Sequence, residues 1–338
     1  MHRTVRAGAL SCAVAVALSA CNRDAPTSSL TSDAPRADVI AADASACANP
    51  PGRPSGIVDT VTAPSPWGIA VRDDGLAFFT ELYDGGVGIT STTTRTVDGF
   101  IATGYNPTSI AFSPDGATAY VANESGQVSV LDVASRQMVG TIPVSNPLAV
   151  RVSPDGSRLF VATGGTTVYI VDLPSGQIVK TVEVGFAPNG FAVHPDGRIL
   201  YVSSFLGSTV SEIDMFTGSV LRTFAVGGTP QEMALDRRGT HLFVANEAGY
   251  LSEIDLETGE IGAPIQLQGG GFGVGVTPDD GEAYITIPFA GVVQVFSLQS
   301  HTVTNTITVG GQPRRVAFSP RGHIGAITNL GGYITFLR

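Results

Sequence analysis

A unit of about 41 residues repeats seven times along most of this chain. Each copy has a turn glycine after its first apolar run, and these glycines are Gly75, Gly116, Gly156, Gly197, Gly239, Gly281 and Gly322. Their spacings are 41, 40, 41, 42, 42 and 41 residues. A fixed period of this length indicates a repeat architecture, in which each unit buries its apolar face against its neighbours.

Each unit contains four short runs in which apolar and polar residues alternate, the pattern of half-buried strands. The first two runs are joined by Ser-Pro-Asp-Gly or a variant, as at 113–116. Pro presets φ, Asp bonds the local backbone and Gly adopts a positive φ, so this sequence predicts a tight hairpin. The third run ends in an acid before a Ser/Thr-Gly turn, and we interpret these acids as acceptors of turn N–H groups, not as metal ligands: Asp172, Asp214 and Asp255.

Four strands per unit at this period predict an all-β, seven-bladed β-propeller with four-stranded antiparallel blades. The last unit ends at Arg338 after three strands, whereas residues 57–62 match the fourth strand of the other units. We therefore expect the N-terminal strand to complete the last blade and close the ring, which removes exposed sheet edges. The propeller is predicted to occupy residues 56–338 as one domain, although at about 150 residues per domain the length suggests two.

The first 20 residues have the pattern of an export signal. A basic start, with Arg3 and Arg6, precedes an apolar stretch at 7–20 that is shorter than the roughly 18 residues a membrane helix needs. The stretch ends Leu-Ser-Ala before Cys21 and resembles the bacterial lipobox. The resemblance implies cleavage before Cys21, lipidation of its thiol and, because Asn22 follows instead of Asp, the outer membrane. The alternative is an ordinary signal peptide that is cleaved nearby.

Residues 21–55 are predicted to be a flexible tether, because they are rich in Ala, Asp, Ser and Pro and nearly free of large apolar residues. Removal of residues 1–20 would leave a charge of 17 − 29 = −12, compared with −10 for the whole chain. This acidic balance argues against a nucleic-acid partner. Cys47 would be the remaining unmodified cysteine, so cysteines supply no disulfide framework or metal cluster.

The second runs of several units resemble the signature of the YVTN-repeat (YncE-like) family of seven-bladed propellers. The runs are Tyr120-Val-Ala-Asn123, Phe243-Val-Ala-Asn246 and Tyr201-Val-Ser-Ser204. The resemblance covers residues 57–338 and implies the fold, but it is weak for function. Units one (78–81) and six (284–288) depart from the motif, and such departures are where a specific site is expected.

Ligand sites in propellers lie at a mouth of the central channel, where loops enter the innermost strands. Two alternate positions of those strands share a face and carry mostly Ala or Gly. Arg151, Glu232 and Arg315 break this rule, and a charge there is costly unless it is paired or hydrated. We hypothesise that they line the channel and form an anion-accepting patch with Arg314. The alternative is a structural Arg–Glu pair across a water-filled channel.

Further side chains are expected at the same mouth, from the loops entering the first strands and the loops between the second and third strands. These are Trp67, Tyr83, Glu124, Asn189, Phe205, Gln231, Glu247, Phe272 and Phe289. With Arg151, Glu232, Arg314 and Arg315 they form the predicted ligand-binding set. The aromatic members would supply either the apolar wall of a small-molecule site or the contact surface for a protein.

No His is expected at the mouth, and the chain has no Gly-x-Ser-x-Gly, His-Glu-x-x-His or Cys-x-x-Cys motif. The glycine-rich run 271–275 imitates a dinucleotide loop but precedes a turn, not a helix. We therefore predict no cofactor, no bound metal and no catalytic residue.

The sequence favours a lipid-anchored envelope scaffold that binds an envelope protein, polymer or small molecule at the channel mouth and touches the membrane through its lipid alone. The alternative is a hydrolase or lyase of the lactonase type, using a metal at the mouth or the set Glu232, Arg151 and Arg315.

Overall fold

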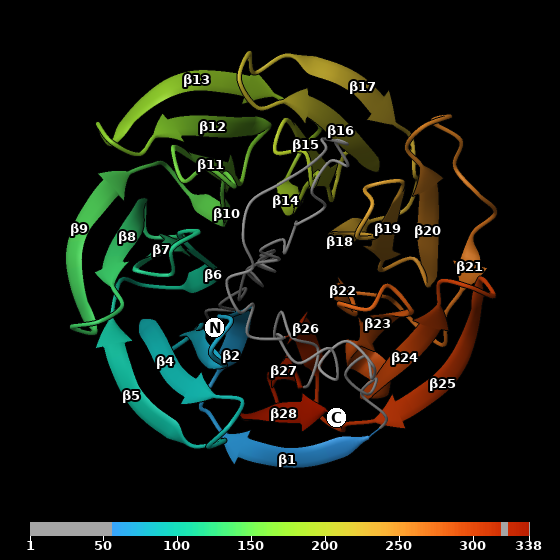
Figure 1. Cartoon of the computed structure of the whole chain (residues 1–338), viewed down its shortest axis with the longest axis horizontal. Coiled ribbons are helices and arrows are strands. Elements are labelled where there is room, and N and C mark those ends of the chain that lie inside the picture. Colours follow the sequence, from blue (N-terminus) through green and yellow to red (C-terminus); the bar gives the residue numbers. More distant parts are fainter. Residues whose placement is uncertain (1–55, 319–323, 338) are drawn as a thin grey trace, which may run out of the picture.

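The computed structural model describes residues 56–318 and 324–337, which form a ring of seven four-stranded antiparallel sheets (Figure 1). The prediction of an all-β, seven-bladed propeller is therefore confirmed. The export signal, Cys21, Cys47 and the tether lie outside the described residues. In the part that is described, no helix is both long enough and apolar enough to cross a membrane.

Each blade is a meander that runs outward from the channel. Blades 1 to 3 consist of β2 (Pro66–Val71), β3 (Leu76–Glu81), β4 (Gly86–Ser91) and β5 (Val97–Ala102); β6 (Pro107–Phe112), β7 (Thr118–Asn123), β8 (Gln127–Asp132) and β9 (Gln137–Pro143); and β10 (Pro147–Val152), β11 (Arg158–Thr163), β12 (Thr167–Asp172) and β13 (Gln177–Glu183). Blades 4 and 5 consist of β14 (Pro188–Val193), β15 (Ile199–Ser204), β16 (Thr209–Asp214) and β17 (Val220–Phe224); and β18 (Pro230–Leu235), β19 (His241–Asn246), β20 (Tyr250–Asp255) and β21 (Ile265–Gln266).

Blade 6 departs from the others. It consists of β22 (Val274–Val276), β23 (Glu282–Ile287), β24 (Val292–Ser297) and β25 (Thr302–Thr308), and its innermost strand is only three residues long. A short 3₁₀ helix, η2 (Pro288–Ala290), joins β23 to β24.

The two ends of the chain together build blade 7. Its strands are β26 (Pro313–Phe318), β27 (Gly325–Asn329), β28 (Tyr333–Leu337) and, as the outermost, β1 (Ile57–Thr62). β1 pairs antiparallel with β28, with Thr60 opposite Thr335, and the two lie side by side at the bottom of Figure 1. The predicted closure of the ring by the N-terminal strand is confirmed.

The small residues of the first strands have a different cause from the one expected. A Cβ built on Gly68 would lie 2.8 Å from the carbonyl oxygen of Thr108 in the next blade, and one on Gly273 would collide with the Arg314 carbonyl. Gly68 and Gly273 therefore face the neighbouring blade, and their small size follows from packing between blades. Two residues further along the first strands, Ala111, Ala192 and Ala234 line a cavity.

Hydroxyl groups bond the inner strands of neighbouring blades. Thr286 accepts the N–H of Gly273 in its own blade at 2.7 Å and donates to the carbonyl of Arg314 in the next blade at 2.7 Å. Thr328 accepts the N–H of Arg315 and donates to the carbonyl of Trp67 at 2.6 Å, which links blade 7 to blade 1. The third residue of the YVTN-like motif thus stabilises the ring wherever it is Ser or Thr.

The predicted hairpins of blades 1 to 5 are present, the one in blade 6 differs, and the turn of blade 7 with Gly322 lies outside the described residues. Gly75, Gly116, Gly156, Gly197 and Gly239 all have a positive φ, as the turn requires. In blade 6 the expected residue was Gly281, but Asp280 takes that position with φ 60° and donates its N–H to the Thr277 carbonyl at 2.9 Å. The expectation for Gly281 is wrong because the turn begins one residue earlier than the glycine spacing suggests.

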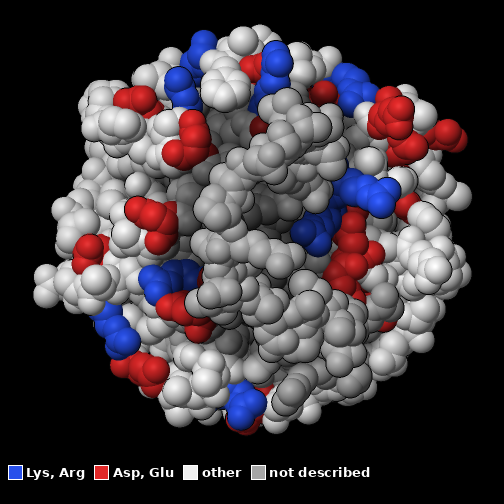
Figure 2. Space-filling view, in the orientation of Figure 1, with Lys and Arg blue, Asp and Glu red and all other residues white. Residues whose placement is uncertain are grey.

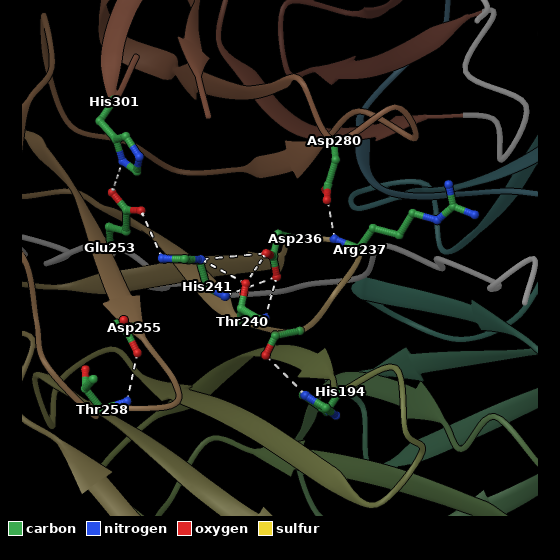
Figure 3. A network of polar contacts seen from close by, with 11 residues as sticks. His194, Asp236, Arg237, Thr240, His241, Glu253, Asp255, Thr258, Asp280 and His301 are labelled. Atoms are coloured by element: carbon green, nitrogen blue, oxygen red, sulfur yellow. Dashed lines mark hydrogen bonds and ion pairs between the residues drawn. The ribbon is translucent and has the colours of Figure 1, made fainter. Parts of the chain in front are cut away.

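Neighbouring hairpins are also joined to one another (Figure 3). His194 in blade 4 contacts the Gly239 carbonyl in blade 5 at 3.2 Å, and the N–H of Arg237 donates to the Asp280 carboxylate in blade 6 at 2.8 Å. Further out, Glu253 lies 2.9 Å from His301 Nδ1, which joins blades 5 and 6. His194 and His301 thus join neighbouring blades at their turns.

The acids that end the third strands accept turn N–H groups, as predicted. Asp255 accepts the N–H of Thr258 at 2.8 Å (Figure 3), and Asp172 and Asp214 accept those of Ser175 and Thr217. The N–H bonds lower the pKa of Asp214 and Asp255, and the Ser175 hydroxyl, together with its N–H, lowers that of Asp172.

Candidate functional site

The antiparallel meander gives the disc two different faces. The mouth face is formed by the loops that lead into the first strands and by the loops between the second and third strands. The hairpin face is formed by the hairpins between the first and second strands and by the turns between the third and fourth. On the side that Figure 2 shows, acidic and basic side chains are interspersed, with wide uncharged areas between them.

Two of the predicted charges form a buried ion pair inside the ring. Arg315 Nη1 on β26 lies 3.4 Å from Glu232 Oε2 on β18, and the side chains are 0% and 1% exposed. Blade 6, which stands between them, has Gly273 and Gly275 on its inner strand. Because these glycines occupy no side-chain volume, the pair can form across blade 6.

Burial dominates the protonation of this group. Desolvation raises the pKa of Glu232 to about 7, against the attraction of Arg315 and Arg151. The same effect lowers the pKa of Arg151 to about 10, although Glu232 attracts the cation. The lactonase-type alternative needs these three groups at a substrate. The structure brings Glu232 and Arg315 together but closes them off from solvent, where they act as counter-charges.

Two aromatic rings and two cations close the mouth end of the channel. The Arg314 guanidinium lies 4.8 Å from the ring centroid of Trp67 and 4.7 Å from that of Phe272, and the Arg315 guanidinium lies 4.5 Å from Phe272. The two rings meet edge to face, with centroids 5.6 Å apart. Both rings are buried and pack with Leu82, so the expected aromatic wall is a closed plug under Arg314.

Three predicted polar residues continue this cluster. Asn189 Nδ2 donates to Gln231 Oε1, and the Gln231 side chain bonds Glu247. Burial raises the pKa of Glu247, and Arg314 opposes that rise. Hydrogen bonds, ring contacts and charge attraction in blades 3 to 7 and blade 1 thus link nine predicted residues, with Arg151 joined through its attraction to Glu232 alone. They are Trp67, Arg151, Asn189, Gln231, Glu232, Glu247, Phe272, Arg314 and Arg315.

The other four predicted residues stand apart from this cluster. Phe205 is buried against Leu148 and Ala187, and Glu124 accepts a hydrogen bond from Asn106 at 3.3 Å. Tyr83 and Phe289 project from the mouth face and are 70% and 86% exposed.

The mouth face exposes three further large apolar residues that were not predicted from the sequence. They lie in loops between blades or between second and third strands: Tyr105, Phe186 and Leu206. Phe186 and Leu206 are neighbours, since the Leu206 N–H donates to the Phe186 carbonyl. The sequence signal that could have identified them is a large apolar residue within a loop rich in turn-forming residues.

A cavity at the opposite, hairpin end of the channel was also missed. It holds about 570 Å³ and is lined by the ends of the first strands of blades 1 to 5 and by the hairpins of blades 1 to 4. Arg151 lines it, and its Nη2 donates to the Phe191 carbonyl at 2.9 Å. Arg151 is thus oriented toward the hairpin end, away from Arg314. Among the described residues, no group of three or more His, Cys, Asp or Glu is placed to hold a metal ion.

These features define a seven-bladed β-propeller in which a cation–aromatic cluster of blades 6, 7 and 1 lies beside a buried ion pair. One similar solved structure is hydrazine synthase from Kuenenia stuttgartiensis, with a TM-score of 0.75 and 21% identity over 85% of this chain and 99% of that chain. At this identity the likeness extends to the fold. No sequence profile of a known protein family matches the chain, and no curated protein does.

Proposed function

We propose that this protein is an exported, lipid-anchored propeller of the YVTN-repeat type that binds a partner protein on its mouth face without catalysing a reaction. The propeller supplies a rigid disc, the segment 21–55 would link it to a lipid on Cys21, and the mouth face would point a set of apolar side chains at the partner. The lipobox-like sequence supports the anchor, and the YVTN-like motifs support the family.

The exposed apolar residues of the mouth face carry the proposal. Five large apolar side chains project from its loops: Tyr83, Tyr105, Phe186, Leu206 and Phe289. Four of the five are aromatic, the residue class enriched in protein interfaces. On the described part of the hairpin face and its turns, Phe216 is the corresponding exposed large apolar residue. Loops otherwise rich in Gly and polar residues have no packing need for such side chains.

The buried cluster supports the same reading. Trp67, Phe272 and Arg314 fix the loops of blades 6, 7 and 1 from below, so the exposed residues stand on a rigid base. A rigid base reduces the entropy lost on binding.

Cross-linking in cells tests the partner-binding part. The chain with Tyr83→Ser and Phe289→Ser is compared with wild type and with a matched control on the other face, Phe216→Ser. We expect cross-linked species to disappear in the double variant and persist in the control. Equal cross-linking in all three would overturn the mouth-face assignment.

The anchor is tested separately by metabolic labelling with an alkyne fatty acid. We expect label on the wild-type chain and none on Cys21→Ser, which should also leave the membrane fraction. Label that persists on Cys21→Ser would contradict the lipobox assignment without affecting the mouth-face proposal.

A further inference from the structure

The cavity at the hairpin end is a partly open, mainly apolar chamber with Arg151 on its wall. Its apolar lining comes from strand ends such as Val152 and Leu235 and from the turn residues Pro114, Pro154 and Pro195. Its volume of about 570 Å³ lies within the roughly 300–1,000 Å³ of small-ligand sites.

The rim of this cavity is fixed before any ligand arrives. Arg72 donates to the Gly116 carbonyl at 2.9 Å and links the hairpins of blades 1 and 2. His194 contacts the Gly239 carbonyl and links those of blades 4 and 5 (Figure 3). A Cβ on Gly156 would lie 3.4 Å from Pro114, so the hairpins also overlap closely. The chamber is therefore preformed, as small-molecule sites usually are.

Arg151 is the exception to the repeat at this place. The equivalent position in the other six units is Ala70, Ala111, Ala192, Ala234, Gly275 and Ala317. The guanidinium donates one hydrogen bond from Nη2 to the Phe191 carbonyl, and its buried Nε has no hydrogen-bond partner among the described residues. A partly buried cation with an unsatisfied buried donor costs free energy, and nothing in the blade architecture requires it, since six units fold with Ala or Gly.

The other charged groups on the lining have partners of their own. Arg72 forms an ion pair with Asp74, and Asp115 accepts hydrogen bonds from Ser113 and from the Ala117 N–H. His194 Nδ1 lies 2.9 Å from Asp196. Glu232 attracts Arg151 from the far side of the strand layer, but it is paired with Arg315. Arg151 is thus the cation with donors to offer a molecule inside the chamber.

From these observations we propose that the cavity binds a small organic monoanion, a carboxylate with an apolar body, whose charged end accepts hydrogen bonds from Arg151. A guanidinium matches the two oxygens of a carboxylate, and the Val, Leu, Met and Pro lining suits the apolar body. The acids near the rim, Asp73, Asp74 and Asp115, disfavour ligands of higher negative charge. This site is at the opposite end of the channel from the mouth face, so it stands or falls independently of the proposed partner binding.

The test uses 4-fluorobenzoate and the full chain, with binding read from ¹⁹F NMR line broadening and competition by hexanoate. The neutral control ligand is 4-fluorobenzyl alcohol. Arg151→Ala restores the residue type of the other units and is expected to fold, and its matched control is Arg158→Ala in the same blade, which does not line the cavity. Thermal unfolding of both variants confirms the fold.

We expect wild type and Arg158→Ala to broaden the carboxylate signal in the millimolar range or below, with displacement by hexanoate. Arg151→Ala should lose about tenfold or more in affinity, the size of a charged hydrogen bond, while Arg151→Lys keeps part of it. Absence of carboxylate binding to wild type would overturn the proposal. Equal binding by Arg151→Ala, or equal binding of the alcohol, would overturn it as well.

Discussion

The two ends of the channel are formed by the same seven inner strands, yet they are closed in different ways. At the mouth end Trp67, Phe272 and Arg314 stack over the buried Arg315–Glu232 pair, and no solvent reaches the pair. At the hairpin end the turns overlap around a chamber of about 570 Å³ in which Arg151 is the exceptional residue. The repeat determines the arrangement of strands at both ends. Single residues that depart from the repeat determine whether an end is packed with side chains or contains a cavity.

The two ends differ in whether the arginine on the inner strand has a carboxylate partner. Arg315 and Arg151 both replace a small residue on an inner strand. Arg315 reaches a carboxylate because blade 6 has glycines in between, whereas Arg151 finds a backbone carbonyl and the cavity. An arginine in place of a small residue therefore forms a buried ion pair at one end and, in our proposal, binds a ligand at the other.

The largest effect is expected from Glu232→Gln, and it depends on pH. Desolvation raises the pKa of Glu232 to about 7, so the ionised carboxylate is disfavoured in the folded protein relative to the neutral form that Gln resembles. We expect almost no change in the free energy of unfolding at pH 4 and a gain of about 3 kcal/mol above pH 8, measured by urea denaturation. Glu183→Gln on the exposed edge of blade 3 is the control. A loss of stability above pH 8 would mean that the attraction of Arg315 and Arg151 outweighs the desolvation of the carboxylate.

Arg315→Met is expected to lower the free energy of unfolding, by a smaller amount that also depends on pH. In wild type the pKa of Glu232 is raised to about 7, so folding stability falls as the pH rises from the unfolded value toward 7. Without Arg315 that pKa rises further, and the fall continues above pH 7. Each added pKa unit is worth about 1.4 kcal/mol at high pH and almost nothing near pH 4. Urea unfolding at several pH values measures this, and a loss that is equal at all pH values would contradict it.

At the hairpin end, His194→Ala is expected to cost about 1 kcal/mol, because it removes one contact to the Gly239 carbonyl and leaves that oxygen free to bond water. The local effect should be larger than the global one. Amide hydrogen exchange is expected to speed up at the hairpin of blade 5 and to remain unchanged at the mouth end. Faster exchange throughout the ring would show that the two ends are not independent.

The smallest effect on stability is expected at the rim of the mouth face. Phe289 is 86% exposed, so Phe289→Ser should change the free energy of unfolding by less than about 0.5 kcal/mol. Thermal unfolding checks this. A larger loss would mean that the ring packs against the disc, which would remove it from the proposed contact surface.

Much of the fold followed from short-range signals. The period, the Pro-Asp-Gly turns and the match of residues 57–62 to other fourth strands predicted seven blades and their closure, because each depends on neighbouring residues or on a simple count. The turn in blade 6 was misplaced because Asp280 adopts a positive φ that the spacing assigned to Gly281. Gly281 lies one residue after the position that adopts the positive φ.

The candidate site was harder to predict from the sequence than the fold. Glu232 and Arg315 were singled out as exceptions on a small-residue face, but the glycines at that position face the next blade, whereas the position of Arg151 lines the cavity. The exposure of Tyr105 and Leu206, and the burial of Phe205 beside them, depend on loop packing between blades, which no local pattern encodes.

By itself the sequence determined the number of blades, the strand order, the hairpins and the location of the exceptional charges, since these are properties of a linear repeat and of local backbone chemistry. Only the tertiary structure decided which exceptions meet. Glu232 and Arg315, which are 83 positions apart in the sequence, form an ion pair, whereas Arg151 lines the cavity at the hairpin end. Ring closure brings blades 5, 6, 7 and 1 to a common axis, and distances across that axis depend on every blade between them.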